Sequence, residues 1–215
     1  MHTLIHQADR LLKGRNFEYA FCGGMAIDLF LGRETRRHGD VDVSIYWPDR
    51  DAVLAYMQSA GFEVYEMLGG GKAHRITDLR DQRRVKRNFF CCTADCEWVE
   101  WNETGEDEVF AVCFQPIGQS ELNFIECICN SRTDTDFLYA RDNGIRRALS
   151  KAILFREDIP YLSPELCLLY KSTDTERKGY QQDYDNAISQ MDAEQKQWLC
   201  QALNALYPQG HKWAP

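Results

Sequence analysis

The segment from Cys22 to Ile45, CGGMAIDLFLGRETRRHGDVDVSI, constrains the fold more than any other part of the sequence. A short apolar run ends at Gly23 and Gly24, and apolar residues at helical spacing follow at once. The chain then alternates as a strand, with Asp40 and Asp42 on one face and valines on the other. Because charge on a strand that wants burial is costly unless it is paired or bound, this face needs a ligand or solvent.

The two parts of this segment suit one chemistry. Carboxylates two residues apart in a strand lie roughly 6.5–7 Å apart, and paired carboxylates can hold one or two Mg²⁺ ions that bridge to phosphates. A Gly-Gly turn before a helix lets the backbone approach a phosphate, with helix amides pointing at it. Together they indicate attack of an oxygen nucleophile on a nucleotide phosphate. Each part alone has a simpler interpretation, a solvated strand end or an ordinary turn.

Charge and composition narrow the class of protein. The chain has 215 residues, 44% of them hydrophobic and 27% charged, as in an ordinary globular protein. Its net charge of −8 argues against a large nucleic-acid-binding surface and favours a cationic partner or a metal. The one basic cluster, residues 72–87, fits a triphosphate contact or a solvated loop with an edge strand, and the second interpretation is favoured.

The sequence shows little sign of membrane insertion, export or a zinc site. The apolar runs are too short to cross a bilayer, and no export signal is visible, so a cytoplasmic location is expected. Nine cysteines fit reduced, mostly buried thiols, because CCTADC has no second pair at zinc-site spacing.

Periodicity predicts a mixed fold. Alternating runs split by polar turns indicate strands and hairpins over residues 69–130. Ser163 with a following proline, and an Asp–x–x–Gln signature from Asp192, mark helix starts. We therefore expect an α/β domain over residues 1–135 and an all-helical domain over residues 136–215. Helical spacing is found at residues 4–12, 25–33, 50–61, 163–173, 181–191 and 192–208.

The order of strand, Gly-Gly, helix and Asp–x–Asp resembles the nucleotidyltransferase superfamily that includes DNA polymerase β. The longer string GGMAIDLFLGRETRRHGDVDVSI is similar to the aminoglycoside and lincosamide nucleotidyltransferases of bacterial resistance, whose segment reads GG-W-A-I-D-x-x-x-G-R-x-T-R-x-H-x-D-[IV]-D. Met25 stands where these relatives carry tryptophan. ECICNSRTDTDFLYARDNGIRR, IPYLSPELCLLYKS and QQDYDNAI also resemble the relatives, so the likeness covers most of the chain, although residues 85–115 show no motif.

The resemblance implies an α+β fold, with a nucleotidyltransferase-type mixed β-sheet domain flanked by helices and then a small all-helical domain. It assigns Gly23 and Gly24 to the triphosphate, and Asp40 and Asp42 to Mg²⁺. It places the third carboxylate of the metal site at Glu126. This residue would be a metal ligand, the general base for the substrate hydroxyl, or both.

The resemblance also implies that Arg36, His38 and Lys171 bind the nucleotide, although each has a simpler structural interpretation. Arg36 and His38 would compensate triphosphate charge or fix the Asp40 loop, or else form an exposed basic turn. Lys171 would reach a phosphate, or else form an interdomain ion pair with Asp183. Asp28 is expected to be structural, pairing with an arginine such as Arg36.

The implied activity is Mg²⁺-dependent transfer of a nucleoside monophosphate, AMP from ATP, to a hydroxyl of a small molecule, with an aminoglycoside-type antibiotic favoured. The acidic balance suits a cationic acceptor. Two alternatives remain open: a toxin-type nucleotidyltransferase that modifies RNA or protein, and a non-catalytic nucleotide-binding module. The acidic residues expected to face the acceptor are Glu165, Asp174, Glu176 and Asp183.

Overall fold

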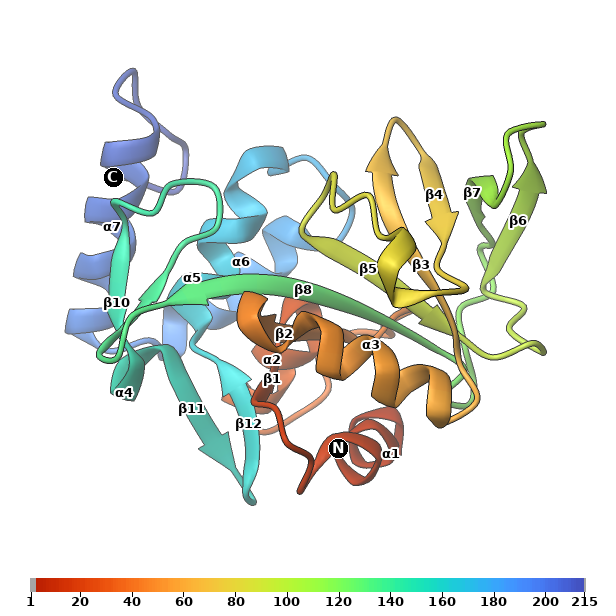
Figure 1. Ribbon diagram of the computed structural model, residues 1–215. Coiled ribbons are helices and arrows are strands. Elements are labelled where there is room, and N and C mark those ends of the chain that lie inside the picture. Colours follow the sequence, from red (N-terminus) through yellow and green to blue (C-terminus); the bar gives the residue numbers. More distant parts are fainter. Residues whose placement is uncertain (1–2, 215) are drawn as a thin grey trace. The chain divides into compact units, whose positions relative to one another are not determined.

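The computed structural model describes residues 3–214 (Figure 1). Residues 3–19 and 38–131 form one compact unit, the sheet unit, and residues 20–37 and 132–214 form a second, the helical unit. These units are not the two segments expected from the sequence, because the Gly-Gly turn and its helix group with the C-terminal part of the chain. The predicted domain boundary at residue 135 stays a prediction.

The sheet unit is built on a mixed sheet. Its strands lie in the order β2-β8-β5-β3-β4-β7-β6, with β2 parallel to β8 and the other neighbours antiparallel. Its elements are α1 (Thr3–Leu12), β2 (Asp42–Tyr46), η1 (Trp47–Asp49), α3 (Arg50–Ser59), β3 (Glu63–Gly69), β4 (Lys72–Arg75), η2 (Leu79–Asp81), β5 (Asn88–Cys92), β6 (Val99–Glu103), β7 (Val109–Phe114) and β8 (Phe124–Arg132).

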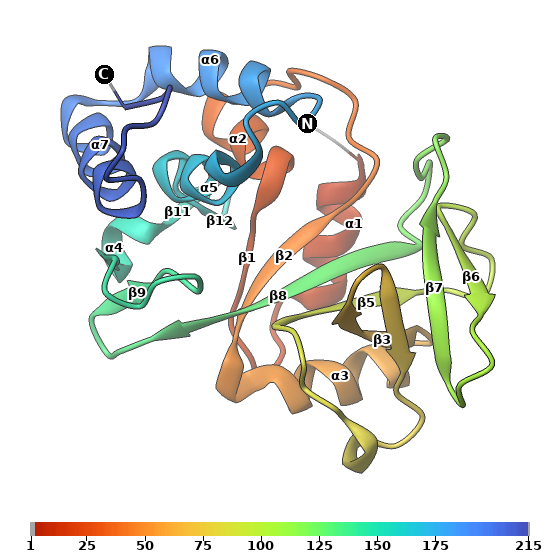
Figure 2. The ribbon, with the colours of Figure 1, turned by 90° about the horizontal axis from the view of Figure 1, so that it is seen from above.

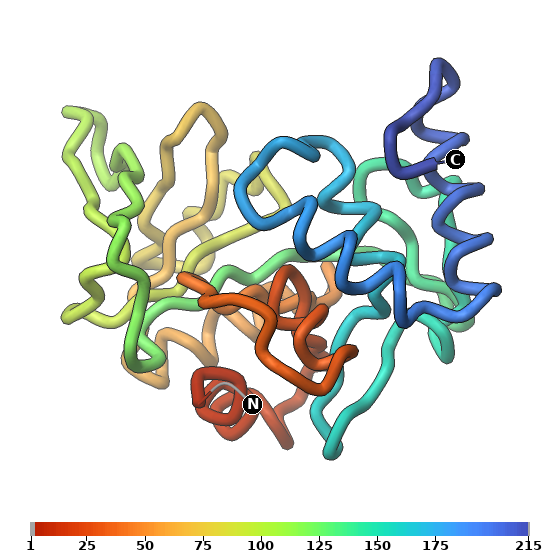
Figure 3. The backbone as a smooth tube through the Cα atoms, turned by 180° about the vertical axis from the view of Figure 1, so that it is seen from behind, coloured from red at the N-terminus to blue at the C-terminus, as the bar shows by residue number. Residues whose placement is uncertain are grey.

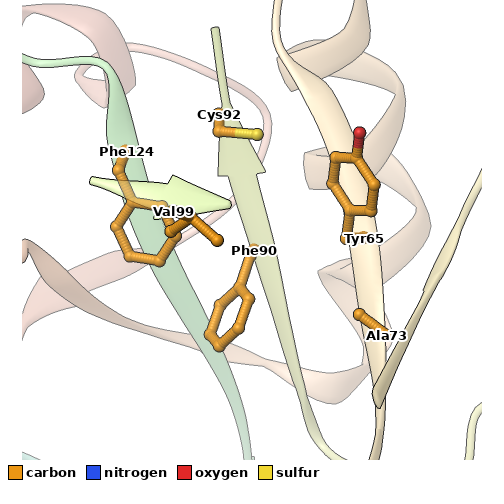
Figure 4. Packing of buried hydrophobic residues seen from close by; sticks show 6 residues of the cluster. All are labelled: Tyr65, Ala73, Phe90, Cys92, Val99 and Phe124. Carbon is orange, nitrogen blue, oxygen red and sulfur yellow. The ribbon is translucent and has the colours of Figure 1, made fainter. Parts of the chain in front are cut away.

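Helix α3 covers one face of this sheet. The guanidinium of Arg50, on α3, lies 5.0 Å from the Phe89 ring and 3.2 Å from Glu66 Oε2, so these side chains share the helix-covered face. Because successive strand residues alternate, their neighbours Tyr65 and Phe90 lie on the opposite face. The cluster on that opposite face consists of Tyr65, Ala73, Phe90, Cys92, Val99 and Phe124 (Figure 4).

The helical unit combines short strands with packed helices. Strand β1 runs parallel to β12, and β12 pairs with β11, while β9 and β10 form a separate antiparallel pair. Helix α5 packs against α2, α6 and α7 (Figure 2), and the chain turns back between α6 and α7 (Figure 3). Its elements are β1 (Tyr19–Phe21), α2 (Gly23–Leu31), β9 (Asp136–Leu138), β10 (Arg146–Ala148), α4 (Leu149–Ala152), β11 (Ile153–Arg156), β12 (Ile159–Leu162), α5 (Pro164–Lys171), η3 (Ser172–Asp174), α6 (Tyr180–Gln190) and α7 (Ala193–Leu206).

The helix starts agree with the sequence, whereas residues 136–162, expected to be helical, contain the short strands β9 to β12. Pro164 opens α5 directly after Ser163, although the Ser163 side chain makes no capping hydrogen bond. Asp192 and Gln195 form the predicted reciprocal capping box of α7. Strands β9 to β12 have three or four residues each, which is too short for an alternating pattern to separate them from loops. Over residues 3–214, every helix is too short or too polar to cross a membrane.

Candidate active site

Asp42 and Glu126 are paired in register on the adjacent parallel strands β2 and β8. The strand spacing is about 4.8 Å, and residues in register project from the same face of a sheet. The Glu126 amide donates to the Val41 carbonyl at 2.9 Å, which fixes this register beside the acidic turn. Asn88, on β5, donates from Nδ2 to Glu126 Oε1 at 2.7 Å. Both carboxylates are half-buried, and they share the face opposite α3.

Asp40 lies just before β2 and keeps the alternation of the strand. Val41 and Val43 are fully buried, whereas Asp40 and Asp42 are partly exposed. The buried valines therefore anchor the segment and leave the two carboxylates on its open side. His38, two residues earlier, is only 4% exposed, so it does not belong to an exposed basic turn.

This set of oxygen ligands fits Mg²⁺ better than a metal that needs a closed protein cage. Within residues 3–214, no group of three or more His, Cys, Asp or Glu side chains is arranged to hold a metal ion. Mg²⁺ is commonly bound through one or two carboxylates and completes its octahedron with water and substrate phosphates. The in-register pair Asp42 and Glu126 supplies such a partial set, whereas structural zinc would require four protein ligands.

The Gly-Gly turn has the backbone that glycine permits. Gly23, the first residue of α2, has φ +66°, in the left-handed region that other residues rarely adopt. Cys22 precedes it in an extended conformation and gives no side-chain cap to the helix. Gly24 is buried. The first amides of a helix have no intrahelical partner, so this turn is suited to an anion.

Two of the predicted nucleotide-binding residues, Arg36 and Lys171, meet at the buried carboxylate of Asp183 in the helical unit. Arg36 donates from Nε and Nη2 to the two oxygens of Asp183, each at 3.0 Å. Lys171 Nζ lies 3.0 Å from Asp183 Oδ2 and 4.1 Å from the centre of the Tyr180 ring. Two cations therefore share one buried carboxylate. The ion pair between Lys171 and Asp183 is therefore present, and it lies within one unit.

Asp28 has the structural role expected of it, and it accepts hydrogen bonds from Thr35, a partner that the sequence did not indicate. Its Oδ1 accepts hydrogen bonds from the amide and the hydroxyl of Thr35, at 3.0 and 2.6 Å. Asp28 is 4% exposed, so these bonds fix the loop that leads from α2 toward Arg36.

Two expectations about charged surfaces have clear outcomes. Arginines of the basic cluster form surface ion pairs, such as Arg75 with Glu108 at 2.6 Å and Arg84 with Asp51 at 2.9 Å. In contrast, the expectation that Glu165 and Asp183 face an acceptor is wrong. Both are fully buried, and Glu165 pairs with Arg147 at 2.6 Å.

Sequence reasoning missed Asn88 and the aromatic residues beside it. Asn88 begins the run NFFCC, and only the strand register shows that its amide meets Glu126. The alternating pattern of this run does indicate a strand, but not which strand lies next to it.

Comparisons with known proteins show the family of this chain. The family model described as Aminoglycoside-2''-adenylyltransferase matches residues 4–137. A 2''-aminoglycoside nucleotidyltransferase of Klebsiella pneumoniae is 32% identical over 116 residues, which cover 54% of this chain and 56% of the relative. The chain thus spans about half the length of this curated relative.

Solved structures share the fold at low sequence identity. A crystal structure of ANT(2'')-Ia in complex with adenylyl-2''-tobramycin has a TM-score of 0.55 at 17% identity, covering 95% of this chain and 97% of that one. The lincomycin-bound lincosamide antibiotic adenylyltransferase LnuA has a TM-score of 0.54 at 13% identity, covering 88% and 97%. Since the family model matches more than half of the residues, this chain belongs to the aminoglycoside-2''-adenylyltransferase family.

Proposed function

We propose that this chain is a Mg²⁺-dependent nucleotidyltransferase that moves AMP from ATP to a hydroxyl of a small molecule, with an aminoglycoside-type antibiotic as acceptor. The observation that carries the proposal is the register of Asp42 with Glu126, which sets two half-buried carboxylates on one sheet face beside the Asp40 turn. The family supports it, as does the relative that is named a 2''-aminoglycoside nucleotidyltransferase.

The proposal gives the acidic residues two tasks. Asp40, Asp42 and Glu126 would hold one or two Mg²⁺ ions together with phosphate oxygens and water. When bound, the metal would stabilise the charge on the attacking and leaving oxygens of the displacement. Glu126 would also accept the proton of the acceptor hydroxyl, with Asn88 fixing the carboxylate through its other oxygen.

The transfer balances without another reactant. The acceptor oxygen forms a bond to the α-phosphorus of ATP, and the bond between that phosphorus and the oxygen bridging to the β-phosphate breaks. Pyrophosphate leaves, and the hydroxyl proton passes to the Glu126 carboxylate. The products are the adenylylated acceptor and pyrophosphate, and the roles of the protein are to position and to accept a proton.

The triphosphate is assigned to residues of the Gly-Gly turn and to cations. The α2 amides at Gly23 and Gly24 would donate to phosphate oxygens. Arg36 and Lys171, which both contact Asp183, would contribute as cations close to the phosphates. His38 is buried and precedes Asp40 by two residues. It would fix the turn that carries Asp40 or contact the nucleotide.

Product analysis tests the proposal directly. The protein is incubated with each of the four nucleoside triphosphates, Mg²⁺ and a panel of hydroxyl-bearing antibiotics, and the products are examined by mass spectrometry. We expect an antibiotic heavier by one AMP, together with pyrophosphate, only when Mg²⁺ is present. Parallel reactions with RNA and with protein address the toxin-type alternative. ATP binding without any turnover would leave a nucleotide-binding module.

A further inference from the structure

A row of side chains leads from the acidic pair across the sheet to a group of aromatic rings. Glu126 is in register with Asp42 on one side and with Phe90 on the other, and Phe90 is in register with Tyr65. Strands lie about 4.8 Å apart, so Tyr65 is about 10 Å from Glu126 along this row. The Trp101 ring stacks on Tyr65, with 3.7 Å between centroids. The acidic residues and the aromatic rings therefore share one face of the sheet.

A second contact joins the same aromatic group to the turn that carries Asp40. A Cβ placed on Gly39 would lie only 2.6 Å from Cη2 of Trp98, so the Trp98 ring rests on the backbone directly before Asp40. Trp98 also contacts Phe114, with centroids 5.6 Å apart, and Phe114 meets Phe90 edge-on at 5.7 Å. We call Trp98, Trp101, Phe110 and Phe114 the aromatic wall.

The aromatic wall is only partly covered by the rest of the protein. Phe114 is 47% exposed, and the other three members are partly buried against the cluster below them. Such exposure of neighbouring aromatic rings is typical of a surface that binds a ligand.

The charge of the surrounding segment selects the kind of ligand. Residues 88–131 contain nine Asp and Glu residues and no lysine, arginine or histidine, and two of the nine, Glu106 and Glu108, form ion pairs with Arg83 and Arg75. Glu103 follows Trp101 by two residues on the same side of β6 and is exposed. Arg75, 5.6 Å from the Phe110 ring, is paired with Glu108. The other acidic residues, Glu103 among them, attract a molecule with ammonium groups more than a triphosphate.

We propose that the aromatic wall is the binding surface for the acceptor, with Phe114 and Trp101 contacting the saturated rings of a cationic amino sugar. Apolar ring faces pack on aromatic side chains, and ammonium groups are attracted to aromatic faces and to carboxylates such as Glu103. The row from Tyr65 to Glu126 then leads from the bound rings to the group that accepts the hydroxyl proton. The inference rests on the proposed function for the identity of the acceptor.

The test compares two exposed phenylalanines. Phe114→Ala removes the most exposed ring of the wall, and Phe155→Ala removes an even more exposed ring, 67% accessible, on β11 outside it. Tobramycin binding is measured by calorimetry without ATP, and ATP binding is measured separately. We expect Phe114→Ala to weaken tobramycin about tenfold, or about 1.4 kcal/mol, with ATP binding unchanged. Phe155→Ala should match the parent in both measurements.

Several outcomes would overturn the inference. They are unchanged tobramycin affinity in folded Phe114→Ala, a parent that does not bind tobramycin, and a loss of ATP affinity in this variant, which would indicate adenine stacking. A lower oligomeric mass of the variant in sedimentation would make the wall a self-association surface instead. Because calorimetry needs no turnover, a parent that binds tobramycin through Phe114 without adenylylating it would refute the proposed function alone.

Discussion

Lys171 and Asp183 form a buried ion pair, with 3.0 Å between Nζ and Oδ2 and side chains 6% and 0% exposed. Arg36 binds the same carboxylate through two hydrogen bonds. Asp183 therefore keeps a strong partner when the lysine is removed, whereas both cations lose their shared carboxylate when Asp183 is removed. Removing Lys171 and removing Asp183 therefore test the proposed nucleotide binding and the stability separately.

Lys171→Met should affect ATP more than stability. Asp183 remains paired with Arg36, so we expect a modest loss of stability, while the ATP KM rises about tenfold because a cation proposed to contact the triphosphate is gone. Asp183→Ala should instead lower the free energy of unfolding by about 3–5 kcal/mol. Lys212→Met, which breaks an exposed pair with Glu176, is the control and should change neither quantity. An unchanged ATP KM in Lys171→Met would leave Lys171 with a structural role only.

The Gly-Gly turn is predicted to contact phosphate as well as to turn the chain. Gly24→Val places a branched side chain beside the first amides of α2, where a phosphate oxygen would lie. ATP affinity should fall by more than tenfold, and Gly24→Ala should give a smaller loss. Binding is measured by titration with ATP, and melting temperature is the control for folding, which should fall only modestly. A folded Gly24→Val variant with the ATP affinity of the parent would show that the turn is purely structural.

The sequence predicts the local elements well because they depend on neighbouring residues. The glycine turn before α2, the capping box of α7 and the alternation of Val41 and Val43 with the aspartates follow from short-range sterics and burial. Pairings between distant strands do not. Asn88 at Glu126 and Trp98 on Gly39 depend on strand order and register, which one sequence does not encode locally.

The burial of charged residues is also difficult to predict from the sequence. Glu165 and Asp183 look like solvent-facing acids in a helical pattern, yet each is buried against a basic partner that is distant in sequence. Burial of a carboxylate depends on a compensating partner. The sequence offers Lys171 as a partner of Asp183, but the pairing of Glu165 with Arg147 becomes visible only in the fold.

Buried thiols should make the protein less stable in alkali. Burial raises the pKa of Cys92 from 9.0 to about 12 and that of Cys129 to about 11. Above pH 9 the unfolded chain therefore loses these protons while the folded chain keeps them. The free energy of unfolding should fall by about 1.4 kcal/mol per pH unit for each thiol between about pH 9 and 11. Urea unfolding under reducing conditions measures this slope, and Cys92→Ala should reduce it. The same slope in that variant would contradict the assignment.

Asp42→Asn should remove metal-dependent activity and keep the fold. The change is nearly isosteric, but it replaces a carboxylate that faces Glu126 by a neutral amide, a much weaker ligand for Mg²⁺. We expect kcat to fall by at least about a thousandfold, or about 4 kcal/mol, with an unchanged circular dichroism spectrum. Asp49→Asn, in η1 beyond the same strand, is the matched control and should be fully active. Full turnover by Asp42→Asn would remove this residue from the metal site.

Glu126→Gln is the sharpest test of the proposed roles of Glu126 as metal ligand and general base. The glutamine keeps an oxygen that can accept the Asn88 hydrogen bond, so the strand register and fold should be retained. It can neither accept the hydroxyl proton nor oppose Asp42 with a charge, so AMP transfer should be abolished while ATP still binds at Gly23 and Gly24. In the parent, Mg²⁺ should raise the melting temperature, because it relieves repulsion between carboxylates, and the shift should shrink in the variant. Glu121→Gln, an exposed glutamate of the same segment, provides the comparison. If Glu126→Gln transferred AMP normally and Glu121→Gln did not, the base would be Glu121, and the row from Asp42 to Phe90 would have only a structural role.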